Sequence, residues 1–195
     1  MAEITRLLRN ASKSKRGMKR LEGLVENIDE TPKKITNANT YNKSTEKSLF
    51  LQEDSASTQM IWGSSFSGKT YLLVENLNKL KNVKEGKPRY IVIMTESPNS
   101  APLKKLDPSL NVIILDRYVP DVARFFVNMN KATNNKFRVL LILDDVITNI
   151  GNGQFNKMFL TYRNNNISST ILLQYPKLVK PSVRHSVHKI IITQL

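Results

Sequence analysis

The sequence predicts an α/β domain in which a mostly parallel sheet carries helices on both faces, preceded by a basic N-terminal extension. Two observations support this fold class. From Leu49 onward, short apolar runs rich in β-branched residues alternate with stretches whose apolar residues recur at helical spacing. The apolar runs are continuous rather than alternating with polar residues, which is typical of parallel strands covered on both faces.

Six runs are expected to be strands, with helices between them. The strands are residues 59–62, 90–94, 111–115, 138–144, 169–174 and 189–193. A helix opens at Thr70 after the first strand, a second begins at Pro120, and a third precedes the fifth strand. The apolar residues expected to face the core are Val122, Phe125, Phe126 and Met129 in the second helix and Phe155, Met158, Phe159 and Tyr162 in the third.

Residues 1–48 differ in composition from the rest of the chain. Residues 1–20 are rich in Lys and Arg and contain one acid, Glu3, while residues 31–48 are mostly small and polar. We expect an arm that is partly disordered or helical, with one short helix around residues 21–28. Such an arm either contacts DNA or a shell protein electrostatically, or is a solvated tail. Residues 49–195 form the folded domain.

Composition narrows the classes of partner and site. Lys and Arg outnumber Asp and Glu by 30 to 16, giving a net charge of +14 and a pI near 10.0. This excess favours a polyanionic partner, first nucleic acid and second an anionic membrane surface. There is no cysteine, which excludes disulfides and thiolate metal sites, and two histidines are too few for a zinc site. No apolar run is long enough for a membrane span or a signal peptide.

Residues 63–70 match the P-loop pattern G-x-x-x-x-G-K-[ST], between a predicted strand and a predicted helix. Gly63 and Gly68 allow the backbone to turn around phosphate groups, so that N–H groups point inward at the helix N-terminus. Lys69 is expected to reach the β- and γ-phosphates, and the Thr70 hydroxyl to bind Mg²⁺. The predicted nucleotide-binding residues are Gly63, Ser64, Ser65, Phe66, Ser67, Gly68, Lys69, Thr70 and Tyr71.

The fourth predicted strand ends in two carboxylates, Asp144 and Asp145. Ligands of open α/β sheets bind at the carboxyl ends of the strands, so both acids are candidates for the phosphate site. Asp144 is expected to hold Mg²⁺ opposite Thr70, and Asp145 to orient or deprotonate the attacking water. An Asp after a strand also commonly caps a helix or starts a turn. In combination with the P-loop, the acid pair favours a RecA/ASCE-like P-loop ATPase domain over residues 49–195.

Two further polar residues follow the acid pair along the chain. Gln174 ends the fifth strand, on the same rim as Asp144, where it could report the γ-phosphate or serve as an ordinary polar residue of the rim. Arg163 stands at a helix end, where it could neutralise transition-state charge in a neighbouring subunit. The alternative for Arg163 is a cation that interacts favourably with the helix dipole.

Together these motifs resemble the FtsK–HerA superfamily of DNA-pumping ATPases. Within it, they are most similar to the genome-packaging ATPases of nucleocytoplasmic large DNA viruses (poxvirus and iridovirus type) and of virophages. The resemblance covers residues 55–195 and rests on the P-loop, Leu143-Asp144-Asp145, Tyr162-Arg163, Ile171-Leu172-Leu173-Gln174-Tyr175 and Pro181-Ser182-Val183-Arg184. It implies that Arg163 acts in trans, that Gln174 senses nucleotide, and that Arg184 lies on a loop before the last strand. Phe66 departs from the family, which usually has small residues there.

The resemblance implies a motor that uses ATP and Mg²⁺ to move double-stranded DNA into a preformed capsid. Its expected partners are double-stranded DNA, capsid or portal-vertex proteins, and other copies of the chain in a ring, a pentamer or a hexamer. The expected location is the viral factory in the host cytoplasm, and the virion. A positive lumen would follow the phosphate backbone without reading bases. The candidate DNA-facing cations are Lys104, Lys105, Arg117, Lys131 and Lys136.

Two other classes of function remain open from the residues. A nucleotide kinase would carry an Arg-rich lid, and no R-x-x-R lid follows the P-loop. A non-motor ATPase or scaffold with a regulatory nucleotide site would show negligible turnover and nucleotide-dependent dimers. The chain has neither the L-S-G-G-Q segment of ABC proteins nor the N-K-x-D motif of GTPases, which leaves ATP as the expected nucleotide.

Overall fold

The computed structural model describes residues 48–51, 55–146, 153–175, 177, 179 and 180–193. Residues 1–47, and with them the predicted arm and its short helix, lie outside the described residues. The described part is built around one six-stranded sheet in which every neighbouring pair of strands is parallel. The predicted α/β fold class is therefore confirmed, and the sheet is parallel throughout the described residues.

The strand order places the two motif-bearing strands close together. The strands are β1 (Thr58–Trp62), β2 (Tyr90–Thr95), β3 (Val112–Leu115), β4 (Val139–Asp144), β5 (Ile167–Leu173) and β6 (Lys189–Ile192), in the order β3-β2-β4-β5-β1-β6. Strand β5 thus separates β1, which leads into the P-loop, from β4, which ends in Asp144. Because all strands run the same way, the residues that follow them meet at one edge, which we call the carboxyl edge.

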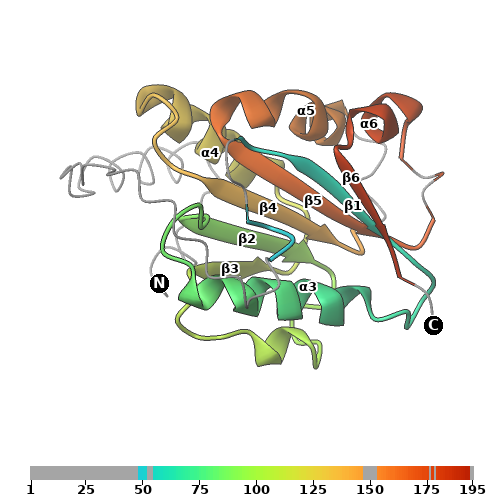
Figure 1. The fold of residues 1–195 in the computed structure, drawn as a ribbon. Helices are drawn as coiled ribbons and strands as arrows, with labels where there is room; N and C mark the ends of the chain where they lie inside the picture. The colour runs from blue at the N-terminus through green and yellow to red at the C-terminus, as the bar shows by residue number, and fades with distance from the viewer. Residues whose placement is uncertain (1–47, 52–54, 147–152, 176, 178, 194–195) are drawn as a thin grey trace.

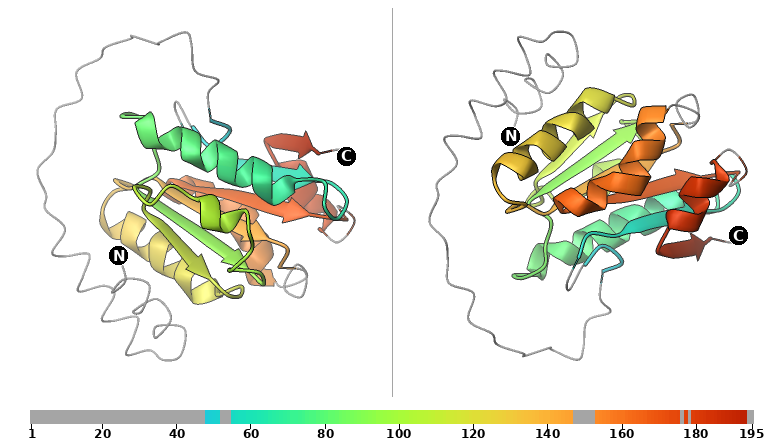
Figure 2. Two further views of the ribbon diagram at one scale, coloured as in Figure 1. Left: turned by 90° about the horizontal axis from the view of Figure 1, so that it is seen from below. Right: turned by 90° about the horizontal axis from the view of Figure 1, so that it is seen from above.

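Helices cover both faces of the sheet. The helix α3 (Lys69–Lys79) lies on one face, and α4 (Pro120–Ala132), α5 (Gly153–Thr161) and α6 (Pro181–Ser186) lie on the other (Figures 1 and 2). Short 3-10 helices complete the connections: η1 (Leu80–Asn82), η2 (Leu103–Lys105) and η4 (Tyr162–Asn165). Side chains of β4 alternate between the two cores, with Leu140 and Ile142 on the α3 side and Leu141 and Leu143 on the other. Burial of both faces explains why the sequences of β2 and β4 are almost continuously apolar.

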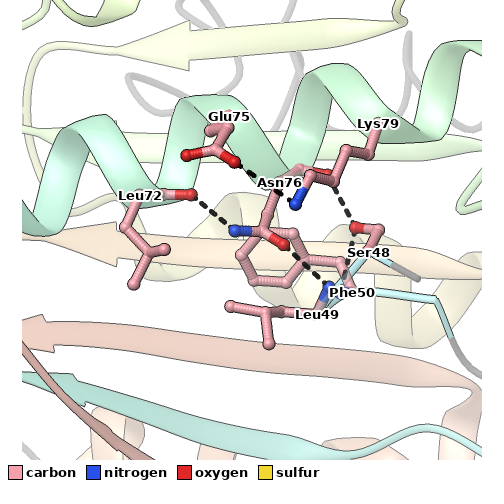
Figure 3. Close-up of polar contacts among 7 residues, drawn as sticks. All are labelled: Ser48, Leu49, Phe50, Leu72, Glu75, Asn76 and Lys79. Atoms are coloured by element: carbon pink, nitrogen blue, oxygen red, sulfur yellow. Dashed lines mark hydrogen bonds and ion pairs between the residues drawn. The ribbon is translucent and has the colours of Figure 1, made fainter. Parts of the chain in front are cut away.

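The segment at Ser48–Phe50 packs on α3 through a buried asparagine (Figure 3). The Asn76 side chain accepts a hydrogen bond from the Leu49 backbone N–H at 3.1 Å and donates to the Leu72 carbonyl at 2.9 Å. The Ser48 hydroxyl donates to the Asn76 carbonyl at 2.6 Å. Phe50 is buried beside these contacts in the core under α3. A polar residue is therefore tolerated in this core because its amide group is hydrogen-bonded.

Most predicted elements are found within one or two residues of their expected bounds. The predicted helical faces of α4 are buried, as is Phe159 of α5, whereas the side chains of Phe155 and Met158 lie outside the described residues. Two details differ. Tyr162 belongs to η4 rather than to the preceding helix, and the segment around Arg184 is the helix α6, not a loop. Pro181 begins that helix, where its missing N–H costs nothing.

Candidate functional site

The P-loop connects β1 to α3 and has no room for larger residues at its first glycine. A Cβ placed on Gly63 would lie 2.1 Å from the Thr193 side-chain oxygen, 2.4 Å from the Ser67 oxygen and 2.6 Å from the Thr193 carbonyl oxygen. Gly68 has a φ of 81°, a left-handed conformation that favours glycine, and it caps the N-terminus of α3. Both glycines are therefore required by the shape of the loop, although for different physical reasons.

Lys69 directs its ammonium group back across the loop. Its Nζ atom donates to the carbonyl oxygens of Gly63 at 3.0 Å and Ser64 at 2.7 Å. The positive group thus lies within the curve of the loop, at the N-terminus of an 11-residue helix that has no acid in its first turn. A cation at the positive end of a helix dipole favours a bound phosphate chain.

Thr70 and Asp144 lie side by side at the carboxyl edge. The Thr70 hydroxyl donates to the Asp144 carboxylate, at 3.2 Å from one oxygen and 3.5 Å from the other. Asp144 is 6% exposed, and this burial raises the pKa of its carboxyl group from 3.8 to about 6, with a smaller contribution from the charge of Asp145. The Thr70 hydrogen bond and the Lys69 charge oppose that rise in pKa. A buried carboxylate is unfavourable unless a cation compensates its charge. A carboxylate buried beside a hydroxyl therefore suits a site that binds a cation.

These two residues are the ones that would hold Mg²⁺. Among the described residues, no group of three or more His, Cys, Asp or Glu side chains could by itself hold a metal ion. Mg²⁺ in phosphate-transfer sites needs only one or two protein ligands, since phosphate oxygens and water complete its octahedron. The Thr70 hydroxyl and the Asp144 carboxylate therefore fit a nucleotide-bound magnesium and do not fit a metal held by the protein alone.

Asp145 and Gln174 form a second contact at the same edge. The Gln174 amide donates to the two carboxylate oxygens of Asp145 at 3.4 and 3.5 Å, which are long distances for hydrogen bonds. Asp145 adopts a left-handed backbone conformation, with φ at 56°, directly after β4. The side chain of Trp62 donates to the Gln174 carbonyl at 3.0 Å and so ties the rim of β5 to the residue before the P-loop. The structure thus brings Gln174 beside the acid pair, as its position at a strand end predicts.

Thr193 supports the P-loop from β6, and the motif analysis did not identify it. Its backbone N–H donates to the Trp62 carbonyl at 2.8 Å, and its hydroxyl lies 2.7 Å from the hydroxyl of Ser67. In the register of the two strands, Trp62 stands opposite Ile192, so the residues that follow each strand are neighbours. Only the pairing of β1 with β6 reveals this contact, because nothing in the local sequence around Thr193 indicates a P-loop partner.

Arg163 and Arg184 lie away from this edge. Arg163 is in η4, which leads into β5, and it therefore lies at the opposite, amino edge of the sheet. Its Nη1 atom donates to His188 Nε2 at 2.8 Å. On the other side of the ring, His188 Nδ1 accepts a hydrogen bond from the Thr58 backbone N–H at 3.3 Å and lies 2.8 Å from the Thr58 hydroxyl. Arg184 is exposed in α6. Neither arginine contacts the P-loop of its own chain through a described contact.

The predicted DNA-facing cations do not share one surface. Lys104 and Lys105 are in η2, and the Lys105 ammonium lies 5.2 Å from the centre of the half-exposed Tyr71 ring. Arg117 follows β3 at the carboxyl edge. Lys131 and Lys136 lie at the end of α4 and in the loop before β4, at the amino edge.

At the P-loop itself, Phe66 is 95% exposed and has a φ of 62°, a strained conformation for a bulky residue.

Comparison with solved structures finds the same fold in viral packaging ATPases. The genome packaging NTPase B204 of Sulfolobus turreted icosahedral virus 2, in complex with AMP, matches with a TM-score of 0.52 and 17% identity over 72% of this chain and 76% of that chain. The DNA-packaging ATPase B204 of Sulfolobus Turreted Icosahedral Virus matches with a TM-score of 0.51 and 18% identity over 70% of this chain and 74% of that chain. The cytoplasmic domain of EssC matches at 0.50 and 16% identity, over 70% of this chain and 30% of that chain.

The comparisons with protein-family models and with curated proteins find no match. Within the part of the chain that the structure describes, no helix is both long and apolar enough to cross a membrane. The all-parallel sheet and the fold shared with B204 and with the cytoplasmic domain of EssC agree with the predicted P-loop NTPase fold. The chain therefore has a P-loop NTPase fold, which it shares with the genome packaging NTPase B204 and with the cytoplasmic domain of EssC.

Proposed function

We propose that this protein is an ATP-driven translocase of double-stranded DNA that packages a viral genome into a preformed capsid. The observation that carries the proposal is the convergence of Lys69, Thr70 and Asp144 at one edge of the sheet. These groups supply what hydrolysis of a magnesium-bound triphosphate needs. Lys69 and the loop N–H groups would neutralise the β- and γ-phosphates, while Thr70 and Asp144 would hold the metal.

Asp145, beside the proposed metal site, is the proposed general base. Asp145 follows Asp144 at the strand end, and its carboxylate would orient a water molecule for in-line attack on the γ-phosphate. Gln174, which donates to Asp145 at long distance, is placed to exchange that partner for the γ-phosphate. When bound, Mg²⁺ neutralises charge on the phosphate oxygens of the leaving group. Hydrolysis would then change the contacts of Gln174, which belongs to the chain segment following β5.

Three considerations support DNA packaging as the work done by this ATPase. The chain shares its fold with B204, which is described as a genome packaging NTPase and as a DNA-packaging ATPase. B204 structures contain AMP, ATP-gammaS and AMPPCP, which are adenine nucleotides. The net charge of +14 suits a polyanionic substrate. We accordingly propose ATP and Mg²⁺ as cofactors, and capsid or portal-vertex proteins as partners in the viral factory of the host cytoplasm and in the virion.

A ring of subunits, a pentamer or a hexamer, is part of the proposal. Arg163 is exposed and lies at the sheet edge opposite to its own P-loop. A site that receives this guanidinium must therefore belong to a neighbouring subunit. In such an arrangement the guanidinium would neutralise charge that develops on the transferred phosphoryl group.

The test measures ATP turnover with and without double-stranded DNA. Lys69→Ala is expected to abolish turnover while leaving the fold intact, and wild-type turnover is expected to rise on addition of DNA. Mixing Lys69→Ala with Arg163→Ala subunits, each inactive alone, should restore part of the activity, because some interfaces then combine an intact P-loop with an intact arginine. DNA that leaves turnover unchanged over a salt series would exclude the motor. Activity stimulated by a small acceptor would identify a kinase, and negligible turnover with nucleotide-dependent dimers a scaffold.

A further inference from the structure

Arg163 is held by a histidine from another part of the sheet. Its Nη1 atom lies 2.8 Å from His188 Nε2, and both side chains are exposed at the surface of the domain. Arg163 belongs to η4, which leads into β5, whereas His188 immediately precedes β6. Strand β1 lies between β5 and β6, so this contact reaches across one strand. The position of the guanidinium is therefore set by two loops of the amino edge and not by η4 alone.

His188 is itself fixed by the start of β1. Its backbone N–H donates to the Thr58 carbonyl at 2.9 Å. Its Nδ1 atom lies 3.3 Å from the Thr58 backbone nitrogen and 2.8 Å from the Thr58 hydroxyl oxygen. Thr58 is buried, and its hydroxyl also donates to the Ser186 carbonyl at 2.7 Å. Because the ring is held on its other side by these groups, Nε2 is a fixed acceptor for a long and flexible side chain.

The partner of Arg163 carries no negative charge. A guanidinium only donates hydrogen bonds, so the Nε2 atom that it contacts must offer a lone pair, as in the uncharged ring. Among the described residues, no carboxylate forms an ion pair with Arg163, whereas Arg124 forms one with Asp121. An uncharged acceptor orients the guanidinium without neutralising it. The positive charge of Arg163 therefore stays available for a phosphate group.

We infer that His188 is a positioning residue, which orients Arg163 toward the nucleotide site of a neighbouring subunit and leaves its charge uncompensated. This inference rests on the proposed function, in which Arg163 acts in trans. An arginine side chain carries about 2 kcal/mol of rotamer entropy, which is lost when it is immobilised. A contact that restricts the side chain before the subunits meet removes part of that cost from the step in which the phosphoryl group is transferred.

The geometry leaves the guanidinium able to bind its target. A guanidinium has five N–H donors in a planar fork, and the described contact with His188 uses a donor on one nitrogen. The others can bind two phosphate oxygens at once. A purely structural role for the contact would be to join the loops before β5 and β6. An acid in place of His188 would serve that structural role equally well, since a charge-assisted hydrogen bond is at least as strong.

The experiment compares ATP turnover, with and without double-stranded DNA, in variants of His188. His188→Phe keeps a ring and removes the acceptor. His188→Gln and His188→Glu have the same length and both offer an oxygen acceptor, but only Glu places a negative charge beside the guanidinium. The matched control is His185→Phe, at an exposed histidine of α6 that has no described contact with Arg163. Thermal unfolding checks that each variant keeps the fold.

His188→Phe should lower kcat by about 10- to 100-fold and leave KM for ATP nearly unchanged, because its own P-loop is intact. His188→Gln should keep most of the wild-type kcat, and His185→Phe all of it. His188→Glu should lose as much kcat as His188→Phe while being at least as stable as His188→Gln. Wild-type turnover in His188→Phe would overturn the inference. Equal turnover of the Gln and Glu variants would also overturn it, because it would show that the contact is only structural.

Mixing subunits tests whether the loss acts on the neighbouring site. Lys69→Ala subunits have an inactive P-loop but an intact Arg163 and His188. Added to His188→Phe subunits, they should restore part of the turnover, as they should for Arg163→Ala. The absence of rescue would mean that His188→Phe damages the P-loop of its own subunit, and it would overturn the positioning role.

Two acids that precede β1, Glu53 and Asp54, lie outside the described residues and require a control of their own. Glu53→Gln with Asp54→Asn should leave kcat unchanged. A loss equal to that of His188→Phe would identify a carboxylate as the group that positions Arg163, and the inference would be wrong.

Failure of the positioning role and failure of the proposed function are distinguishable. If Arg163→Ala loses turnover and His188→Phe does not, the positioning role is wrong and the proposed function stands. If both variants keep wild-type turnover, the trans arginine is wrong and His188 loses its role with it. If the His188 variants behave as expected but DNA never stimulates the wild type, the motor is wrong and the positioning role stands.

Discussion

Thr70 and Asp144 are separated by 74 residues in the sequence, and the Thr70 hydroxyl lies 3.2 Å from the Asp144 carboxylate. Strand β5 lies between the strands that lead to them, so the contact crosses the sheet at its carboxyl edge. The P-loop and the acid pair are thereby parts of one site, which is the condition that the sequence-based interpretation required.

Removal of the Thr70 hydroxyl should impair magnesium-dependent turnover. Thr70→Ala loses both a predicted metal ligand and the hydrogen bond to Asp144, so we expect kcat at millimolar Mg²⁺ to fall by about 100-fold or more, which corresponds to about 3 kcal/mol. Thr70→Ser retains the hydroxyl and should keep most of the activity. The measurement is steady-state phosphate release as a function of magnesium concentration. Equal activity of the Ala and Ser variants would contradict the metal role.

The buried Asp144 should make the protein less stable as the pH rises. Its pKa is raised from 3.8 to about 6 in the folded state, so the folded protein binds more protons than the unfolded chain between these values. Stability against unfolding should therefore fall from about pH 4 to about pH 6 and then level off, by at most about 3 kcal/mol from this group. Asp144→Asn should remove this contribution and be more stable than the wild type at pH 7.5 without magnesium.

Urea unfolding at pH 4 and pH 7.5 measures the pH dependence of wild-type stability and the effect of Asp144→Asn on it. The difference in unfolding free energy between Asp144→Asn and wild type should be larger at the higher pH, because the wild-type carboxylate is ionised there. Addition of Mg²⁺ with a non-hydrolysed ATP analogue should reverse the order of stability, since the cation offsets the buried charge only in the wild type. A pH-independent difference between the two proteins would show that burial of the carboxylate is not its cause.

The two P-loop glycines should respond differently to alanine. Gly63→Ala forces a Cβ against the Thr193 carbonyl and side chain, and the resulting backbone shift should cost about 1–3 kcal/mol. Gly68→Ala meets no atom within 4 Å, and its cost of about 1 kcal/mol comes from the left-handed conformation. Adding Thr193→Ala should recover part of the loss in Gly63→Ala and none in Gly68→Ala. Chemical denaturation of the two glycine variants, each alone and combined with Thr193→Ala, provides the measurement.

Asn76 should be required for attachment of the Ser48–Phe50 segment to α3. Asn76→Ala leaves the Leu49 N–H without its acceptor, which should cost about 1–3 kcal/mol, or roughly 2–4 °C in Tm for each kcal/mol. Asn76→Asp keeps the acceptor oxygen but loses the donor to Leu72 and adds a buried charge, so it should also be destabilised at neutral pH. Asn78→Ala is the control: this partly exposed residue of the same helix bonds Lys105 and Asp107 and not the Ser48–Phe50 segment, and its loss should cost less because water can reach the groups left unpaired. Thermal unfolding followed by circular dichroism compares the three.

The sequence predicted the features that depend on local pattern. Six strands and the helices α3, α4 and α5 were recognisable because apolar periodicity and the residues that start helices act over a few neighbours. The same holds for the P-loop motif and for the left-handed conformation of Gly68, whereas the space at Gly63 is limited in part by Thr193, which is distant in sequence. The resemblance implied a loop around Arg184, where the structure has the helix α6, and a six-residue segment with few apolar residues gives little periodic signal against that expectation.

The tertiary structure decided which distant segments meet. The order of strands places β5 between β1 and β4, and β6 beside β1, and this order arises from packing of the whole core. The contact between Ser67 and Thr193, and the one between Trp62 and the Gln174 carbonyl, join residues more than 100 positions apart and leave no local trace.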